Sequence, residues 1–293
     1  MERPPKAVEE SKPASAGSER IRELKSLILT NEQYREHSFA TNTEGNRTYV
    51  YEIVSGEKTL TYFGSTHTND AESLVFDEIH QAFEKANPEV VYVEGMEFIN
   101  HHKGAVREKF AGVTPKEAKK QGENYYTLKL AVDSGADFES PEFNRADEIR
   151  QLIESGFSHE DIFSFYFARP VYGYQRQAKE PSKEECLQYI SRNMKAFREA
   201  TSWSQEEIDS LEEKASADLN IEDEVTYQSS VDPIPWEGKD STVTNEISRR
   251  LSLLRDEYQF GRIAESLEKY DRIFVVYGSA HAVKLEPALR ELL

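Results

Sequence analysis

Short apolar runs separated by a turn signal mark the first predicted strands of the chain. Arg47 to Ile53 and Lys58 to Phe63 are rich in β-branched and aromatic residues, and Ser55-Gly56 lies between them. Two such runs joined through a glycine-containing turn are typical of a β-hairpin. We therefore expect two antiparallel strands in this part of the fold.

The second of these runs leads into a predicted strand–helix–strand unit. Apolar residues recur at helical spacing from Leu74 to Phe83, and Asn69 or Asp70 suits the amino-terminal cap of that helix. Val90 to Val93 then predicts a buried strand. In a β-α-β unit the two strands run parallel with a right-handed crossover, so their carboxyl ends meet at the same edge of the sheet.

The carboxyl-terminal part of the chain repeats this order. Thr244 to Lys269 places apolar residues on one helical face, Arg272 to Tyr277 predicts a strand, and a short helix follows up to Leu289. Ligands of open α/β sheets bind outside the carboxyl ends of the strands. The end of this last strand is therefore expected at the edge that already holds the ends of the two earlier ones.

The middle of the chain has mostly helical periodicity, with helices predicted over Lys183 to Phe197 and Ser204 to Ser216. We predict a helical insertion from about 140 to 235 that covers the carboxyl ends of the strands, and a separate helical bundle is the alternative. Residues 1 to 20 have little to bury and are predicted as a disordered tail. The expected fold is one α/β domain over 21 to 293, with a mixed, mainly parallel sheet flanked by helices.

Composition narrows the classes of partner. Lysine and arginine number 36 against 54 aspartate and glutamate residues, which gives a formal net charge of −18. Because this charge repels phosphate backbones and anionic lipid surfaces, we expect neither nucleic acid nor a membrane as a partner. The sequence shows no apolar run of signal-peptide or membrane-helix length, and a single cysteine, Cys186, excludes an internal disulfide. A cytoplasmic protein is expected.

The same short motif occurs at two predicted strand ends. Gly64-Ser65-Thr66-His67 follows the second strand, and Gly278-Ser279-Ala280-His281 follows the last one. The chain lacks the G-x-S-x-G, Walker and G-x-G-x-x-G patterns, which removes support for a serine hydrolase, a nucleotidase or a dinucleotide enzyme. A single G-x-x-H is weak evidence, because a histidine after a strand often only caps the next helix. Its repetition at two strand-to-helix turns favours a functional histidine pair.

Glu94 ends the strand Val90 to Val93 and completes a candidate site with His67 and His281. Two imidazoles and a carboxylate suit a divalent ion such as Mn, Zn or Co, with positions left open for water and substrate. Such an ion would lower the pKa of a bound water to about 7 and polarise the carbonyl under attack. The sequence therefore predicts a hydrolytic metal site.

The other motif residues are expected to border this cofactor. Gly64 and Gly278 would supply permissive dihedral angles and a close approach of the backbone. Ser65 and Ser279 would orient the imidazoles or donate to a developing oxyanion.

These motifs resemble those of the TraB/PrgY and Tiki superfamily, which is related to erythromycin-esterase-like and ChaN-like proteins. The resemblance consists of both G-x-x-H turns, the strand end Val93-Glu94-Gly95 and the Arg255-Asp256 region of the long helix. It covers roughly residues 48 to 100 and 244 to 293. The resemblance implies an α/β sheet with a helical insertion and, from Tiki-like members, a divalent-metal-dependent protease.

Carried over residue by residue, the resemblance makes His67, Glu94 and His281 metal-binding or catalytic groups and Arg255 a supporting positive charge. Arg255 can equally form a structural ion pair. Our first hypothesis is a metal-dependent hydrolase of a peptide or small-molecule substrate. A metal-free hydrolase, in which a histidine oriented by Glu94 activates water, and a non-catalytic protein that binds a peptide or a haem-like ligand are the alternatives. Formation of a homo-oligomer through exposed sheet edges is also open.

Overall fold

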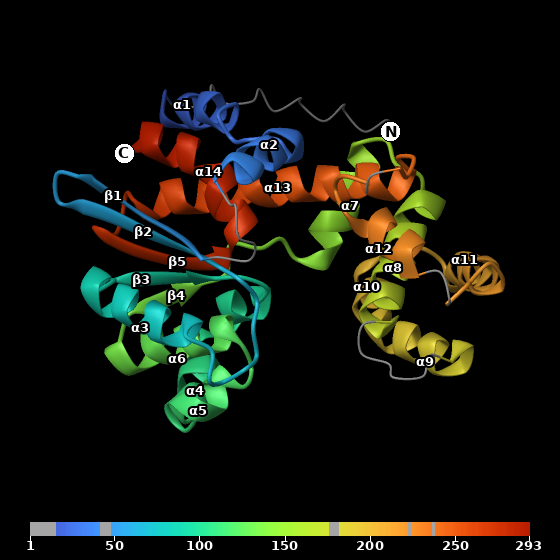
Figure 1. Ribbon diagram of the computed structural model, residues 1–293, viewed down its shortest axis with the longest axis horizontal. Coiled ribbons are helices and arrows are strands. Elements are labelled where there is room, and N and C mark those ends of the chain that lie inside the picture. The colour runs from blue at the N-terminus through green and yellow to red at the C-terminus, as the bar shows by residue number, and fades with distance from the viewer. Residues whose placement is uncertain (1–15, 42–47, 176–181, 222–223, 236–237) are drawn as a thin grey trace, which may run out of the picture.

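A mixed five-stranded β-sheet organises the computed structural model, which describes residues 16–41, 48–175, 182–221, 224–235 and 238–293 (Figure 1). The strands lie in the order β1-β2-β5-β3-β4. β1, at one edge, is antiparallel to β2, and the remaining neighbours are parallel. The predicted α/β fold with a mixed, mainly parallel sheet is therefore confirmed. The strands are β1 (Tyr49–Ser55), β2 (Lys58–Ser65), β3 (Val90–Val93), β4 (Asp137–Glu139) and β5 (Arg272–Gly278).

The parallel strands bring the predicted motifs to one edge of the sheet. β1 and β2 form the predicted hairpin, and β2 and β3 run parallel as predicted, with β5 between them. Val276 of β5 pairs with Phe63 of β2 on one side and with Val93 of β3 on the other. The residues that follow these three positions therefore leave the sheet side by side.

Helices cover both faces of the sheet because its strands are apolar on both sides. Val275 of β5 packs into one hydrophobic cluster, whereas Phe274 and Val276 pack into another. This alternation follows from the side-chain direction along a strand, which reverses at each residue. The face of Val275 is covered by α1 (Ala16–Lys25), the second half of α13 (Val243–Ser266) and α14 (Ser279–Leu292). The opposite face is covered by α3 (Val75–Ala86), α4 (Lys103–Ala111), α5 (Pro115–Lys119) and α6 (Glu123–Ser134).

A block of helices lies beyond the sheet and has its own hydrophobic cluster, which includes Phe163 and Phe197 (Figure 1). Ile247 and Leu251, from the first half of α13, belong to the same cluster, so one long helix connects the block to the sheet. The predicted mostly helical character of this segment is confirmed. The block consists of α7 (Arg145–Glu154), α8 (His159–Gln175), α9 (Lys183–Asn193), α10 (Lys195–Ala200), α11 (Gln205–Ala217) and α12 (Glu224–Val231).

Two helix boundaries differ from the predictions. α3 begins at Val75 rather than directly after Asn69 or Asp70, because polar side chains hold the preceding segment in turns. The Asp70 carboxylate accepts a hydrogen bond from the backbone of Glu72 at 3.1 Å instead of capping the helix. The helix predicted over 183–197 is divided at Met194 into α9 and α10.

Of the predicted disordered tail, residues 1–15 lie outside the described residues, and α1 already begins at Ala16. The short strand β4, the 3-10 helix η1 (Glu97–His101) and α2 (Asn31–Thr41) had no counterpart in the sequence prediction. In the part of the chain that the structure describes, no helix combines the length and the apolar character needed to cross a bilayer.

Candidate functional site

His67, Glu94 and His281 surround one small space beside the backbone of Gly278. A methyl group placed on Gly278 would lie 3.4 Å from Glu94 Oε2, 3.5 Å from His281 Cδ2 and 3.7 Å from His67 Nε2. His67 Nε2 itself lies 3.8 Å from Glu94 Oε2. The structure thus brings together the three side chains that the sequence placed at one edge of the sheet. We call this volume the shared space.

The ring of His67 is held by Glu123, the first residue of α6. His67 Nδ1 lies 2.5 Å from Glu123 Oε1, and Glu123 Oε2 accepts a hydrogen bond from the Thr68 backbone at 3.2 Å. The hydrogen bond to Glu123 raises the pKa of His67, against the opposing effect of burial and with a further contribution from the Glu94 charge. This contact fixes the ring so that Nε2 faces the shared space.

His281 lies in the first turn of α14, and its ring is held in the same way. Its Nδ1 contacts the carboxylate of Asp256, whose other oxygen forms an ion pair with Lys284. Asp256 is fully buried, and Lys284 is 2 % exposed. Burial alone would raise the pKa of Asp256, but the charges of His281 and Lys284 outweigh it and lower that pKa. Because Nδ1 is occupied, the Nε2 edge of the His281 ring remains for the shared space.

Glu94 is held from two sides, by the backbone of Gly278 and by Arg255. Gly278 N donates to Glu94 Oε2 at 2.7 Å, and Arg255 Nη2 donates to Glu94 Oε1 at 3.0 Å. Arg255 also forms a two-point contact with Glu142 at 2.7 and 3.0 Å and donates to the Tyr277 hydroxyl. Burial opposes the charge of Arg255, but Tyr277 and the two carboxylates raise its pKa well above the usual value. Arg255 therefore lies beside Glu94 as a positive charge and is an ion-pair partner as well.

The motif glycines allow close packing, as predicted. The prediction that they need dihedral angles open only to glycine is wrong. Neither Gly64 nor Gly278 has a positive φ. A Cβ on Gly64 would come within 2.7 Å of Ala282 Cβ and of the Tyr49 carbonyl oxygen. Gly64 thus lets α14 approach β2, and Gly278 leaves room for the three site side chains.

The motif serines do not orient the imidazoles. The buried Ser65 hydroxyl donates to the Thr66 carbonyl at 3.1 Å. Ser279 begins α14, and among the described residues its hydroxyl makes no hydrogen bond to either ring. The orientation predicted for the two serines is provided by the carboxylates of Glu123 and Asp256 instead.

Sequence reasoning assigned no role to three carboxylates of this site, Glu123, Glu142 and Asp256. Asp256 stands directly beside Arg255 in the segment that carries the family resemblance, which was an available signal. Glu142 follows β4 as Glu94 follows β3, but this signal requires recognition of a strand of three residues. Glu123 has no local signal, because its contact with His67 spans 56 residues of sequence.

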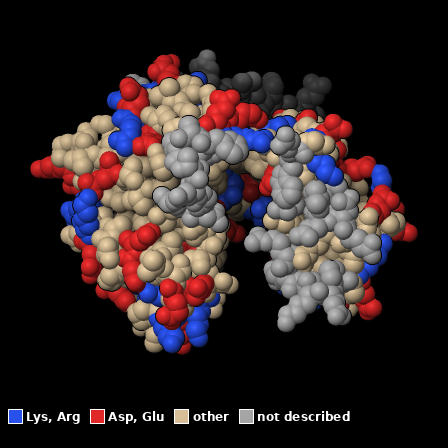
Figure 2. Space-filling model, viewed as in Figure 1, with Lys and Arg blue, Asp and Glu red and all other residues tan. Residues whose placement is uncertain are grey.

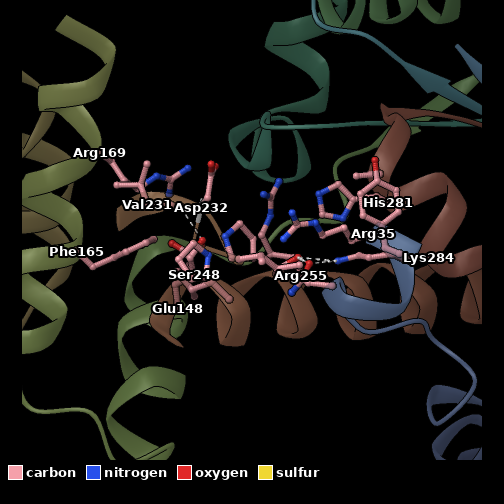
Figure 3. A pocket seen from close by; sticks show the side chains of 18 residues that line it. Arg35, Glu148, Phe165, Arg169, Val231, Asp232, Ser248, Arg255, His281 and Lys284 are labelled. Atoms are coloured by element: carbon pink, nitrogen blue, oxygen red, sulfur yellow. Dashed lines mark hydrogen bonds between the residues drawn. The ribbon is translucent and has the colours of Figure 1, made fainter. Parts of the chain in front are cut away.

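Two cavities are lined by residues of the site. Glu94 and His67 line one of ≈ 420 Å³ together with Glu123. His281 and Arg255 line the other, of ≈ 760 Å³, which extends to α8 in the helical block (Figure 3). Both volumes lie in the range of small-molecule binding pockets.

The donor set fits a divalent ion in part. The two imidazoles and Glu94 are ligand types that Zn, Mn and Co accept, and a carboxylate on Nδ1 is a common outer partner of metal-bound histidines. Within the described ranges, however, no three His, Cys, Asp or Glu side chains stand in a ready metal-binding arrangement. Both Glu94 oxygens already accept hydrogen bonds, so an ion would use the remaining lone pair of Oε2.

Comparisons with protein-family models, with curated proteins and with solved structures find no match for this chain. Its function is therefore inferred from its own residues. The fold and the site define an α/β protein with two histidines and a glutamate at the carboxyl ends of parallel strands.

Proposed function

We propose that this protein is a divalent-metal-dependent hydrolase of peptide or amide bonds, with its active site at His67, Glu94 and His281. The observation that carries the proposal is the pairing of each imidazole Nδ1 with a carboxylate, His67 with Glu123 and His281 with Asp256. This pairing leaves both Nε2 atoms for the space that Glu94 also borders. Histidines that bind metals usually donate their other ring N–H to such a carboxylate.

Each residue of the site has a role in such a reaction. A bound ion would lower the pKa of a water to about 7 and polarise the substrate carbonyl. One lone pair of Glu94 Oε2 remains beside the Gly278 N–H, and it would serve either as a ligand of the ion or as the acceptor of the proton that the attacking water loses. Arg255 fixes the Glu94 carboxylate through Oε1, and Glu142 in turn fixes Arg255. Glu123 and Asp256 hold the two rings in place.

Features outside the site support the same proposal. The resemblance of both G-x-x-H turns to the TraB/PrgY and Tiki superfamily supports a metal-dependent reaction. The net charge of −18 supports a substrate other than nucleic acid. The single cysteine, Cys186, supports action in a reducing, cytoplasmic compartment. β1 lies at a sheet edge, where a second copy of the chain can pair.

A metal-free hydrolase is the second candidate, and one observation favours it. Both oxygens of Glu94 are occupied, by Arg255 and by the Gly278 backbone, which weakens Glu94 as a metal ligand. In that case His67, held by Glu123, would act as general base on a water in the shared space.

Metal content and turnover separate these candidates. We expect purified protein to contain stoichiometric Mn, Zn or Co, and the double variant His67→Ala with His281→Ala to lose it. Hydrolysis of a peptide library should stop on chelation and return with Mn or Zn. Turnover that survives exhaustive chelation would instead favour the metal-free reaction.

The matched control is His101→Ala with His102→Ala, which removes two exposed histidines at the end of η1. This control should keep both metal and activity. Stoichiometric metal that persists in the His67 and His281 double variant would contradict the proposed site. Haem or peptide binding without turnover of peptides or esters would identify the non-catalytic alternative.

A further inference from the structure

The larger cavity collects positive charge in a protein that is strongly acidic. Four cationic side chains line it, and they come from α2, α8, α13 and α14: Arg35, Arg169, Arg255 and Lys284. Figure 2 shows lysine and arginine atoms at the floor of the hollow between the sheet and the helical block. A concave, low-dielectric surface with one sign of charge concentrates ligands of the opposite sign.

Most charges around this cavity already have partners. Arg255 is paired with Glu94 and Glu142, and Lys284 is paired with Asp256. Glu148, an acid of the cavity wall, contacts Arg145 and accepts a hydrogen bond from a tyrosine hydroxyl. These groups therefore define the local field but are not free to bind a ligand.

Arg169 is the exception. It is exposed to the cavity, its guanidinium lies over the ring of Phe165 at 5.5 Å, and it has no ion-pair partner among the described residues (Figure 3). An arginine stays protonated in proteins, and Glu148, an acid of the cavity wall, is already paired with Arg145. An anion in the cavity would supply the ion-pair partner that Arg169 lacks among the described residues.

The wall of the cavity near Arg169 is apolar in part and also includes Asp232. Phe165 of α8 and Leu251 of α13 are buried side chains that border the cavity, and Val231 and Ile234 border it near the end of α12. His281 and Arg255 lie at the opposite end of the same cavity. A ligand that reaches from Arg169 to His281 would therefore pass along an apolar surface.

We propose that this cavity binds the substrate through an anionic group, a carboxylate or a phosphate, at Arg169 and through an apolar segment against Phe165, Leu251 and Ile234. The bond to be cleaved would then lie at His281 and the shared space. Calling the ligand a substrate rests on the proposed function, whereas its binding to the cavity does not. The inferred substrate class is an amphiphilic anion.

Calorimetric titration of the full chain with four probes of equal chain length tests this inference. Decanoate and decyl phosphate are the anionic probes, decanol is the neutral one and decyltrimethylammonium is the cationic one. We expect the anionic probes to bind at least about tenfold more tightly than the other two, because a charge-assisted hydrogen bond has about that worth. The tighter of the two anions identifies the preferred head group.

Variants place the binding site within the cavity. Arg169→Gln should weaken decanoate binding by about tenfold or more, and Ile234→Glu should weaken it through loss of apolar contact and like-charge repulsion. Arg192→Gln is the matched control, since Arg192 is an exposed arginine of the same helical block that lies over the ring of Tyr189. This control should bind decanoate as the unmodified protein does.

Two outcomes would overturn the inference: equal affinity for anionic and cationic probes, or unchanged decanoate affinity in Arg169→Gln. The comparison of probes uses the unmodified chain, so it holds even if a variant does not fold. His67→Ala separates this result from the proposed function, because His67 lines only the smaller of the two cavities beside the shared space. Decanoate binding retained in this variant together with loss of metal and turnover would support both proposals independently.

Discussion

The backbone N–H of Gly278 donates a hydrogen bond of 2.7 Å to Glu94 Oε2. The end of β5 thereby fixes the carboxylate that follows β3, so two strand ends form one unit. The same glycine has no side chain, and the volume that a side chain would fill is bordered by Glu94, His67 and His281.

Gly278→Ala should therefore fold normally and lose function. Its φ of −54° and ψ of 139° suit alanine, and the nearest atom to the new methyl group would be Glu94 Oε2 at 3.4 Å. We expect kcat/KM to fall by about 100-fold, because the methyl group occupies the shared space and displaces the reacting groups. Hydrolysis assays combined with thermal unfolding measure both effects.

Gly64→Ala is the comparison, because the same change in the other motif should affect stability instead. A methyl group there would lie 2.7 Å from the Tyr49 carbonyl oxygen, so the free energy of unfolding should fall by about 1–3 kcal/mol. Full activity of Gly278→Ala would show that the chemistry takes place elsewhere.

The buried pair Asp256 and Lys284 predicts a non-additive effect on stability. Asp256→Asn leaves the Lys284 charge buried without its carboxylate, so the free energy of unfolding should fall by roughly 3–5 kcal/mol. Addition of Lys284→Met should recover part of this loss. Urea unfolding of the single and double variants gives the coupling. The control is Glu199→Gln, which breaks an exposed pair with Lys195 and should change the free energy of unfolding little. Fully additive effects of Asp256→Asn and Lys284→Met would contradict this account.

Arg255→Lys should lower activity more than it lowers stability. A lysine keeps the positive charge, but it cannot reproduce the two-point contact with Glu142 while also donating to Glu94. We expect kcat/KM to fall by about 100-fold as the Glu94 carboxylate loses its fixed position. Arg255→Met should in addition destabilise the fold, because two partly buried carboxylates then face each other without a cation. Unimpaired turnover by Arg255→Lys would reduce Arg255 to a structural ion pair.

The contact of His67 with Glu123 predicts a defined dependence on pH. The pKa of His67 is raised from 6.5, so its share of the stability is present below pH 6.5 and is lost as pH rises through the raised value. Despite burial, the pKa of Glu123 is lowered from 4.5 by His67, so its share is present above pH 4.5 and is lost as pH falls through the lowered value. The contact between His67 and Glu123 should therefore stabilise the fold most between pH 4.5 and pH 6.5.

NMR titration of the histidine ring in metal-free protein measures this effect. Glu123→Gln should move the pKa of His67 downward, because the hydrogen bond that raises it loses its charge. An unchanged pKa in this variant would show that Glu123 does not hold the ring in solution.

The sequence revealed the centre of the fold because the central strands are continuous apolar runs. Val90 to Val93 and Ile273 to Val276 are almost completely buried on both faces, and their short length and β-branched residues favour a strand over a buried helix. The order of the strands could not be predicted from the sequence, because β5 lies between β2 and β3 although it comes last in the chain. Strand insertion of this kind depends on contacts across the whole chain.

Three residues of the candidate site could be predicted from the sequence for a related reason. Glu94 directly follows β3, His67 lies two residues after β2 and His281 lies in the first turn of α14 after β5, so the ends of buried strands place all three. Glu123 and Glu142 reach the site from the start of a helix and from the end of a three-residue strand with two charged residues. Periodicity contains no information about such contacts, because they depend on how separate elements pack.

Helix α13 belongs to two hydrophobic clusters along its length. Ile247 and Leu251 pack in the helical block, Phe260 and Ile263 pack on the sheet, and Arg255 lies between these two stretches. A small bend of α13 would therefore move the far wall of the cavity toward the histidines or away from them. Because Arg255 lies between the two stretches, the same bend would change both its contact with Glu94 and the width of the cavity.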